Sequence, residues 1–184
     1  MILHAEYFPS IQWVSAMLHQ PAVEIEQWEN YQKQGLRNRC KILGAEGIIT
    51  LSVPLTGGRE QRTLMKDVQI NNSTNWATGQ LRAIKSCYAK APFFDHYYEP
   101  IEKLLTQNHE SLLDLNVSII KMITRWLKWE GTLTLTETFK GAEKPAMAPV
   151  KPYIQVFHDR QPFQPGLSVL DAFFCIGGKQ IYDL

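Results

Sequence analysis

Apolar and polar residues follow two different periods along the chain, and each period predicts one kind of element. Short apolar or alternating runs are typical of strands, and they occupy residues 1–5, 23–26, 40–43, 48–53, 68–70, 132–136 and 153–157. Apolar residues spaced by three or four are typical of amphipathic helices, and they occupy residues 11–18, 77–88, 101–107 and 111–129. This mixture predicts an α+β or open α/β fold, in which two to three helices pack on a mixed sheet.

Polar and special residues mark where these elements begin and end. Ser10 is expected to cap the first helix, and the glycine-bearing residues 44–47 predict a hairpin that ends at Pro54. The polar and glycine-rich residues 57–62 predict a loop. The prolines at 92 and 100 indicate that residues 93–98 form a separate short turn.

The last forty residues predict an extended stretch followed by a return to the fold. Prolines 145, 149 and 152 predict an internal linker over residues 144–152, and residues 153–184 form a tail that re-enters the fold. Ser168 is typical of a helix cap, and Asp171 follows it by three residues, as the acidic partner of a capping box would. We favour that structural role for Asp171 over a catalytic one, and we expect residues 1–184 to form one domain.

Composition then narrows the class of protein. The 184 residues are 45% hydrophobic and 20% charged, and 19 basic against 18 acidic residues leave a formal net charge of +1. Such a balance excludes a strong overall attraction to nucleic acid or to an anionic membrane. The most apolar helix is interrupted by Lys121 and Arg125, so no membrane span is expected. The start of the chain has no pattern of a secretory signal, which predicts a cytoplasmic location.

Cysteine and histidine spacing predicts neither a disulfide framework nor a metal site. The three cysteines are widely separated without a CxxC pair, and the five histidines show no i,i+4 pair. The common nucleotide, hydrolase and metalloprotease motifs are absent, and we expect no cofactor. Among the histidines, His4 is the best candidate for a general base because it ends the first predicted strand, where ligands often collect in α/β folds. The alternative is a neutral, hydrogen-bonded histidine near the core.

A short basic segment is the main candidate for binding. Residues 33–41 contain Lys33, Arg37, Arg39 and Lys41 together with Asn38 and a glycine. Guanidinium and ammonium groups on one segment can converge on a phosphate or carboxylate, although the same charges also suit a solvated strand edge. Arg82 and Lys85 lie one turn apart on the helix predicted at residues 77–88 and extend the possible anion site.

Seven collinear pieces give the chain a family resemblance. They read LHAEYFP from Leu3, YQKQGLRNR from Tyr31, LSVPL from Leu51, Trp76, SCYAKAPFF from Ser86, LLDLN from Leu112 and LSVLD from Leu167. This order resembles the WbqC-like protein family over nearly the whole chain. The resemblance implies a bacterial protein, often linked to surface polysaccharide gene clusters. Relatives often carry an acidic pair after the second strand, where this chain has Glu24, Glu26 and Glu29.

The resemblance also changes which polar residues are favoured as ligand-binding residues. The polar residues that match it are His4, Lys33, Asn38, Arg39, Tyr88 and Asp171. They favour an anion-facing role for Lys33, Asn38 and Arg39, whereas Arg37 and Lys41 are interpreted as ordinary hairpin charges. The resemblance indicates a pathway but no reaction, so the reaction has to be inferred from the candidate site residues.

Two hypotheses follow. The first is a transferase of surface polysaccharide (O-antigen) biosynthesis that moves an acyl or aminoacyl group to an amino sugar carried on a nucleotide. His4 would be the base and Tyr88 or Asp171 an orienting group, while Lys33, Asn38, Arg39, Arg82 and Lys85 would bind the anionic ligand. The second is a non-enzymatic binding or assembly protein of the same pathway. The sequence leaves the oligomeric state and the presence of a reaction open.

Overall fold

The computed structural model describes residues 1–57, 63–145 and 149–184, and it confirms the α+β class. Three short parallel strands form one sheet in the order β1-β2-β5, namely β1 (Ile2–His4), β2 (Ala22–Glu26) and β5 (Thr132–Leu135). An antiparallel hairpin of β3 (Arg39–Gly44) and β4 (Gly47–Ser52) forms the second sheet. The strands therefore form two sheets, where the pattern predicted one mixed sheet.

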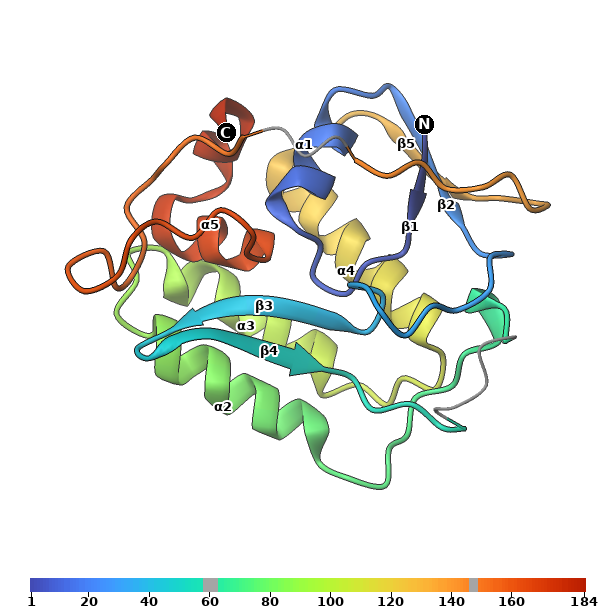
Figure 1. Ribbon diagram of the computed structural model, residues 1–184, viewed down its shortest axis with the longest axis horizontal. Helices are drawn as coiled ribbons and strands as arrows, with labels where there is room; N and C mark the ends of the chain where they lie inside the picture. The colour runs from blue at the N-terminus through green and yellow to red at the C-terminus, as the bar shows by residue number, and fades with distance from the viewer. Residues whose placement is uncertain (58–62, 146–148) are drawn as a thin grey trace.

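The parallel sheet is built from chain segments that lie far apart in sequence. Helix α1 (Ile11–Leu18) connects β1 to β2, while the hairpin and three further helices intervene before β5. The central strand β2 pairs Ile25 with Leu3 on one side and with Leu135 on the other. Figure 1 shows this sheet above the hairpin, with α4 (Leu112–Leu127) crossing between them.

The remaining helices enclose the hairpin and the end of the chain. Helix α2 (Trp76–Tyr88) runs beneath the hairpin in Figure 1, and α3 (Phe94–Leu105) lies behind it. Helix α5 (Val169–Ile176) is followed by the 3-10 turn η2 (Gly178–Asp183) near the C-terminus. Serines cap three of these helices, because Ser10, Ser111 and Ser168 each accept a backbone N–H of the first turn. Each such cap stabilises its helix by about 1 kcal/mol.

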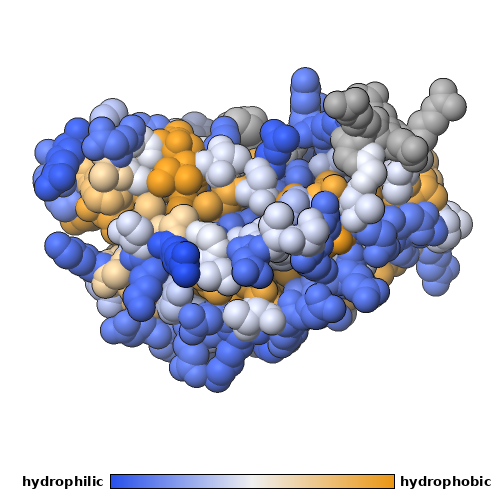
Figure 2. Space-filling model, turned by 90° about the horizontal axis from the view of Figure 1, so that it is seen from below, coloured by the Kyte–Doolittle hydropathy of each residue, from blue (hydrophilic) through white to orange (hydrophobic). Residues whose placement is uncertain are grey.

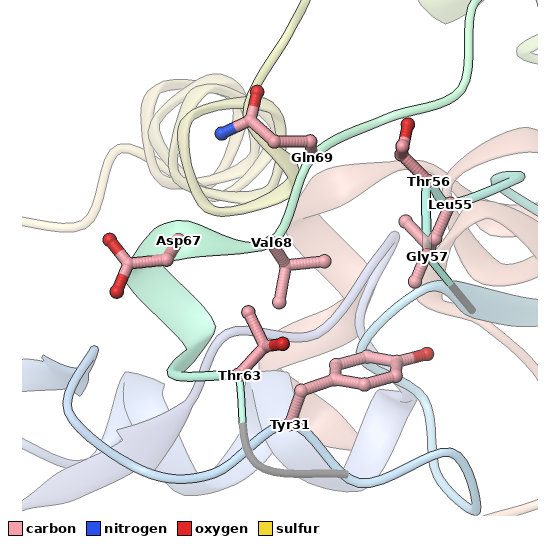
Figure 3. A pocket seen from close by; sticks show the side chains of 8 residues that line it. All are labelled: Tyr31, Leu55, Thr56, Gly57, Thr63, Asp67, Val68 and Gln69. Carbon is pink, nitrogen blue, oxygen red and sulfur yellow. The ribbon is translucent and has the colours of Figure 1, made fainter. Parts of the chain in front are cut away.

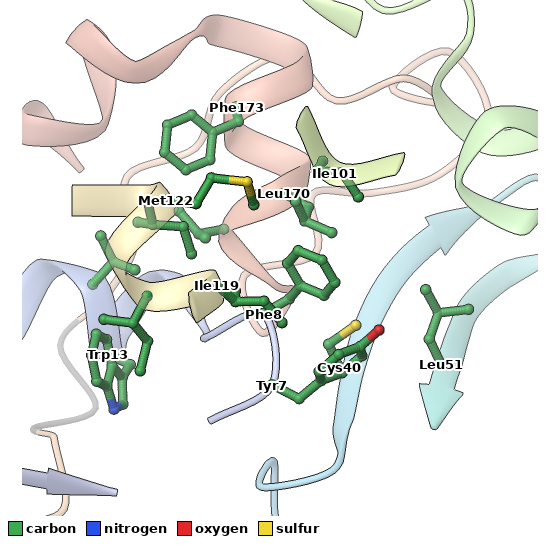
Figure 4. Close-up of a cluster of buried hydrophobic side chains, with 14 of the residues drawn as sticks. Tyr7, Phe8, Trp13, Cys40, Leu51, Ile101, Ile119, Met122, Leu170 and Phe173 are labelled. Atoms are coloured by element: carbon green, nitrogen blue, oxygen red, sulfur yellow. The ribbon is translucent and has the colours of Figure 1, made fainter. Parts of the chain in front are cut away.

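One cluster of buried hydrophobic side chains joins these elements. Helix α4 supplies much of it, and Ile119 and Met122 meet Phe173 and Leu170 of α5 there (Figure 4). Tyr7 and Phe8, from the loop after β1, enter the same cluster beside Cys40 of β3. The face seen from below is mainly hydrophilic, with apolar side chains gathered towards the end that carries the hairpin turn (Figure 2).

Four local predictions are wrong. Residues 68–70 form no full strand, since the 3-10 turn η1 (Met65–Asp67) precedes them and single bridges pair Ile70 with Leu55 and Gln69 with Ser111. Residues 94–98 are part of α3, with Phe93 as its N-cap. The helix contains Pro100, and the carbonyl that loses its partner belongs to exposed His96, where water can replace it. Residues 153–157 are irregular.

The fourth concerns Asp171. It lies in the first turn of α5 behind the cap Ser168, as predicted, but its carboxylate turns inward to side chains of other elements. The predicted polar loop at 57–62 and the linker at 144–152 fall partly outside the described residues, which omit 58–62 and 146–148.

Candidate functional site

Three polar side chains from separate segments meet at the end of β1, and we call them the His4 cluster: His4, Glu29 and Arg37. Nδ1 of His4 lies 2.9 Å from Oε1 and 2.8 Å from Oε2 of Glu29. Arg37 donates from Nε to Oε1 at 2.8 Å and from Nη2 to Oε2 at 2.7 Å. The two parallel bonds form the bidentate geometry that guanidinium and carboxylate groups prefer.

The position of the ring proton follows from these contacts. Arg37 Nη2 also lies 2.8 Å from Nδ1, and Nδ1 can either donate or accept. A lone pair on Nδ1 would accept from Arg37 but would face two negative oxygens. A proton there donates to the carboxylate, and Arg37 Nη2, which can only donate, then makes no hydrogen bond to the ring and keeps its bond to Oε2 of Glu29. We therefore assign the proton to Nδ1. The Nε2 lone pair then remains available, since no described residue forms a hydrogen bond with it.

Glu29 remains ionised in this environment. Burial is the largest influence and opposes the charge, yet hydrogen bonds from His4 and Arg37 and the positive charge of Arg37 hold the pKa of Glu29 below its usual value. The side chains of Arg37 and Glu29 are only 6% and 8% exposed. Because the charge of Arg37 is paired with that of Glu29, Arg37 stabilises the cluster, and an anionic ligand would bind to other cations.

The cluster opens into a pocket of about 420 Å³. Besides His4 and Glu29, its walls carry two aromatic rings, two amides and two small residues: Trp28, Phe139, Asn30, Gln32, Gly141 and Ala142. Lys66 lies 5.1 Å from the centre of the Trp28 ring and so covers one of its faces. Phe139 is 66% exposed and presents the freer ring to a ligand.

A fully buried carboxylate fixes the walls of this pocket. Glu26 accepts backbone N–H groups of Trp28 at 2.8 Å, Lys140 at 2.8 Å and Gly141 at 2.9 Å, and the hydroxyl of Thr136 at 3.0 Å. Burial opposes the charge most strongly, but these donors together hold the pKa of Glu26 below its usual value. The segment after β5 is thus tied to the end of β2.

Helix α4 holds the two chain segments that carry His4 and Arg37. The amide of Asn116, which is fully buried, donates to the carbonyls of Ala5 at 2.9 Å and Arg37 at 2.7 Å. Tyr7 N–H donates to the Leu36 carbonyl at 2.8 Å. The loop between these contacts contains Phe8 with φ of 39°, a conformation that costs a non-glycine residue free energy and persists here within tight packing.

The residues predicted to face an anion are distributed differently. The side chain of Asn38 is buried, accepting from the Tyr31 hydroxyl at 2.9 Å and donating to the Val53 carbonyl at 2.8 Å. Lys33 is half-buried and Arg39 is exposed at the start of β3. Tyr31 lines a separate pocket of about 200 Å³ with Leu55 and Val68, shown in Figure 3.

Tyr88 and Asp171 meet at the other end of the hairpin. The Tyr88 hydroxyl donates to Asp171 at 2.8 Å and accepts the Leu43 N–H at 2.9 Å. Asp171 also accepts the Tyr153 hydroxyl at 2.5 Å and the Gln155 amide at 2.9 Å. Leu43 is four residues beyond Arg39 in β3, or about 13 Å along the strand. This pair therefore lies away from the His4 cluster.

The other predicted cations and the metal prediction can be placed as well. Arg82 and Lys85 are both exposed on α2. Within the described residues, no group of three or more histidine, cysteine or acidic side chains is arranged to hold a metal ion. No helix in the same part of the chain is long and apolar enough to cross a bilayer.

Glu29 and Arg37 are the residues that sequence reasoning missed. Arg37 was interpreted as a hairpin charge, but it is buried and contacts both other members of the His4 cluster. The acidic residues after the second strand, together with a basic residue just before the hairpin, were the available signal. The spacing of eight residues between Glu29 and Arg37 does not show that these two, among the charged residues nearby, form a pair.

Comparison with known proteins agrees with the resemblance in the sequence. A model of the WbqC-like protein family matches residues 5–158, which include Glu29, Arg37 and most of the pocket walls. His4 lies immediately before the matched range and Asp171 beyond it. No curated protein and no solved structure matches the chain. Since the family match covers most of its length, the chain belongs to the WbqC-like protein family.

Proposed function

We propose that the protein is a bacterial transferase of surface-polysaccharide (O-antigen) biosynthesis, which moves an acyl or aminoacyl group to an amino sugar carried on a nucleotide. The observation that carries this proposal is the His4 cluster at the wall of an open pocket. Glu29 orients the ring through Nδ1, and the free Nε2 can act as a base. The same arrangement of carboxylate, imidazole and reacting group recurs in unrelated acyl-transfer enzymes.

In the proposed reaction, the sugar amine attacks the acyl carbonyl carbon of a thioester or ester. The new C–N bond forms as the bond to the leaving sulfur or oxygen breaks. Nε2 of His4 takes the proton lost by the amine and returns it to the leaving group. Ionised Glu29 stabilises the intermediate imidazolium, while Arg37 holds Glu29 in place.

The walls of the pocket suit a sugar. Phe139 offers an apolar ring face, and Asn30 and Gln32 offer donors and acceptors for hydroxyl groups. We assign Lys33 and Arg39 to the phosphate groups of the nucleotide because Lys33 directly follows Gln32 in the chain and Arg39 is exposed. Arg82 and Lys85, on a different helix, have no role in this proposal.

Tyr88 and Asp171 have a structural role in the proposal, since their polar atoms bind the hairpin and the tail. The three cysteines are unpaired, which supports a cytoplasmic location, where thiols stay reduced.

The test uses purified protein with nucleotide-linked amino sugars and acyl or aminoacyl donors, and mass spectrometry to detect the amide product. His4→Ala should reduce turnover at least a hundredfold, the usual contribution of a general base, without changing the melting temperature by more than a few degrees. His96→Ala changes an exposed histidine on α3 and is the matched control. Absence of turnover with every donor, or full activity of His4→Ala, would refute the transferase.

A non-enzymatic sugar-binding protein is the second candidate, and the strongly exposed Phe139 at the pocket favours it. It predicts that nucleotide amino sugars bind without conversion, and that Phe139→Ala weakens binding while His4→Ala leaves it nearly unchanged. Calorimetry on both variants separates the two candidates.

A further inference from the structure

A second cavity lies on another part of the molecule, where the end of α2 meets the tail. It encloses about 490 Å³ between residues 86–92, residues 154–160 and α5. In Figure 1 the orange tail lies beside the connection from α2 to α3, at the left of the view. None of the residues proposed for the transferase reaction lines this cavity.

Among the described residues, the cavity is lined by basic groups and by no carboxylate. Lys90, His158 and Arg160 line it, and all three are exposed to solvent. Among the residues that the structure describes, Arg160 forms the one ion pair of the three, from Nε to Asp159 at 3.2 Å. Both side chains of that pair are more than half exposed, so it contributes little and leaves the other guanidinium nitrogens available. In a chain with a net charge of +1, this is a local excess of positive charge.

The nearest buried acid does not cancel these cations. Asp171 lies beneath Gln155, and its oxygens already accept the two tyrosine hydroxyls and the Gln155 amide described above. The Gln155 carbonyl lies 2.9 Å from Nδ1 of His158. Because a carbonyl can only accept, Nδ1 carries a proton, and Nε2 can donate to a phosphate oxygen in the protonated form of the ring.

Apart from Ser86 and Gln155, the rest of the cavity wall consists of apolar residues and cysteines. Pro92, Ile154 and Phe157 contribute hydrocarbon or ring surface, and Ile154 is 68% exposed. A site that combines a few convergent polar groups with apolar walls is typical of a small-molecule pocket. A ligand that fits has a compact anionic group at one end and an apolar or ring part at the other.

We propose that this cavity binds a phosphate monoester of an apolar or aromatic compound, with the phosphate held by Lys90, His158 and Arg160 and the apolar part against Pro92, Ile154 and Phe157. Arginine and lysine are the residues that bind phosphate most often, and the volume suits a small soluble ligand. The proposal goes beyond the transferase function and is independent of it.

Phenyl phosphate is the probe, titrated into the full chain by calorimetry beside inorganic phosphate and phenol. Phenyl phosphate should bind more tightly than either. Lys90→Ala and Arg160→Ala should each weaken its binding about tenfold, as expected for the loss of a charge-assisted hydrogen bond. Lys85→Ala removes an exposed cation of α2 that does not line the cavity, and it should leave the affinity unchanged.

A chemical measurement locates the ligand independently. Cys87 and Cys175 line the cavity, whereas Cys40 is 1% exposed in the core. Saturating phenyl phosphate should slow the alkylation of Cys87 by iodoacetamide at least threefold, with Cys40 unreactive throughout until the protein unfolds.

Several results would overturn the proposal. One such result is that phenyl phosphate does not bind at millimolar concentration. Another is that Lys85→Ala weakens its binding as much as Lys90→Ala and Arg160→Ala do. A third is that saturation with phenyl phosphate leaves the alkylation rate of Cys87 unchanged. Loss of binding in His4→Ala would also overturn it, because the probe would then occupy the other pocket. Failure of the transferase assay has no bearing on these outcomes, so the two proposals can fail separately.

Discussion

Replacing Tyr88 by phenylalanine removes one oxygen atom that joins three elements. The hydroxyl donates to Asp171 of α5 and accepts the N–H of Leu43 in β3, while its own residue ends α2. Phenylalanine keeps the ring, so no large cavity forms. The change therefore isolates the two hydrogen bonds.

The expected loss of stability follows from the two bonds. A hydrogen bond to a charged group contributes about 1.5–3 kcal/mol, and a buried N–H left without a partner costs about 1–3 kcal/mol. Burial, the largest influence, raises the pKa of Asp171 above its usual value, while hydrogen bonds from Tyr153, Tyr88 and Gln155 act in the opposite direction and favour the ionised form. Since the remaining groups relax in part, we expect Tyr88→Phe to lower the free energy of unfolding by about 3–5 kcal/mol.

Urea unfolding followed by tryptophan fluorescence measures this loss. Tyr153→Phe removes only a donor to Asp171 and should cost about 1.5–3 kcal/mol. Tyr98→Phe removes a hydroxyl 3.5 Å from Glu102 on the surface and should cost less than about 0.5 kcal/mol. A loss below about 1 kcal/mol for Tyr88→Phe, or one no larger than for Tyr98→Phe, would refute the reasoning.

Three further predictions concern the His4 cluster and its pocket. The folded-state pKa of Glu29 lies below the ordinary value of 4.5, so its stabilising effect is present above pH 4.5 and is lost as the pH falls through the lowered pKa. In Glu29→Gln, the free energy of unfolding should therefore fall less steeply with decreasing pH below 4.5 than in the wild type. Arg37→Lys cannot keep two parallel bonds, and carbon-13 NMR should show the pKa of Glu29 rising towards 4.5. Glu26→Gln places an amide against backbone donors, so chymotrypsin should cleave at Phe139 at least tenfold faster, whereas an unchanged rate would show that Glu26 does not hold this segment.

Local signals predicted the helices well because caps and periodicity act within one or two turns. Ser10 and Ser168 are N-caps as expected, and the helix predicted at residues 111–129 is α4, which spans Leu112–Leu127. The hairpin likewise follows from two apolar runs and a short glycine-bearing turn. These elements need little information from the rest of the chain.

The site could not be predicted in the same way because its contacts join distant segments. Glu29 lies 25 residues from His4, and which acid near β2 reaches the histidine depends on how the loop is folded. Arg37 and Asn38 precede β3, so the alternation of a strand does not say which of them faces inward, and both are buried. Asp171 fitted a local capping pattern, but three donors from α2 and the tail bind its carboxylate instead.

The two bonds of Asn116 have a consequence for how the protein forms during synthesis. They link α4 to Ala5, 111 residues earlier, and to Arg37, 79 residues earlier. Contacts across such separations form late, since a long loop must close before they contribute. A nascent chain that has not yet released α4 from the ribosome has its histidine, acid and arginine but lacks the amide that binds the carbonyls of Ala5 and Arg37. The His4 cluster is therefore completed only after well over half of the chain has emerged, and a premature stop before Asn116 should leave a product without a formed site.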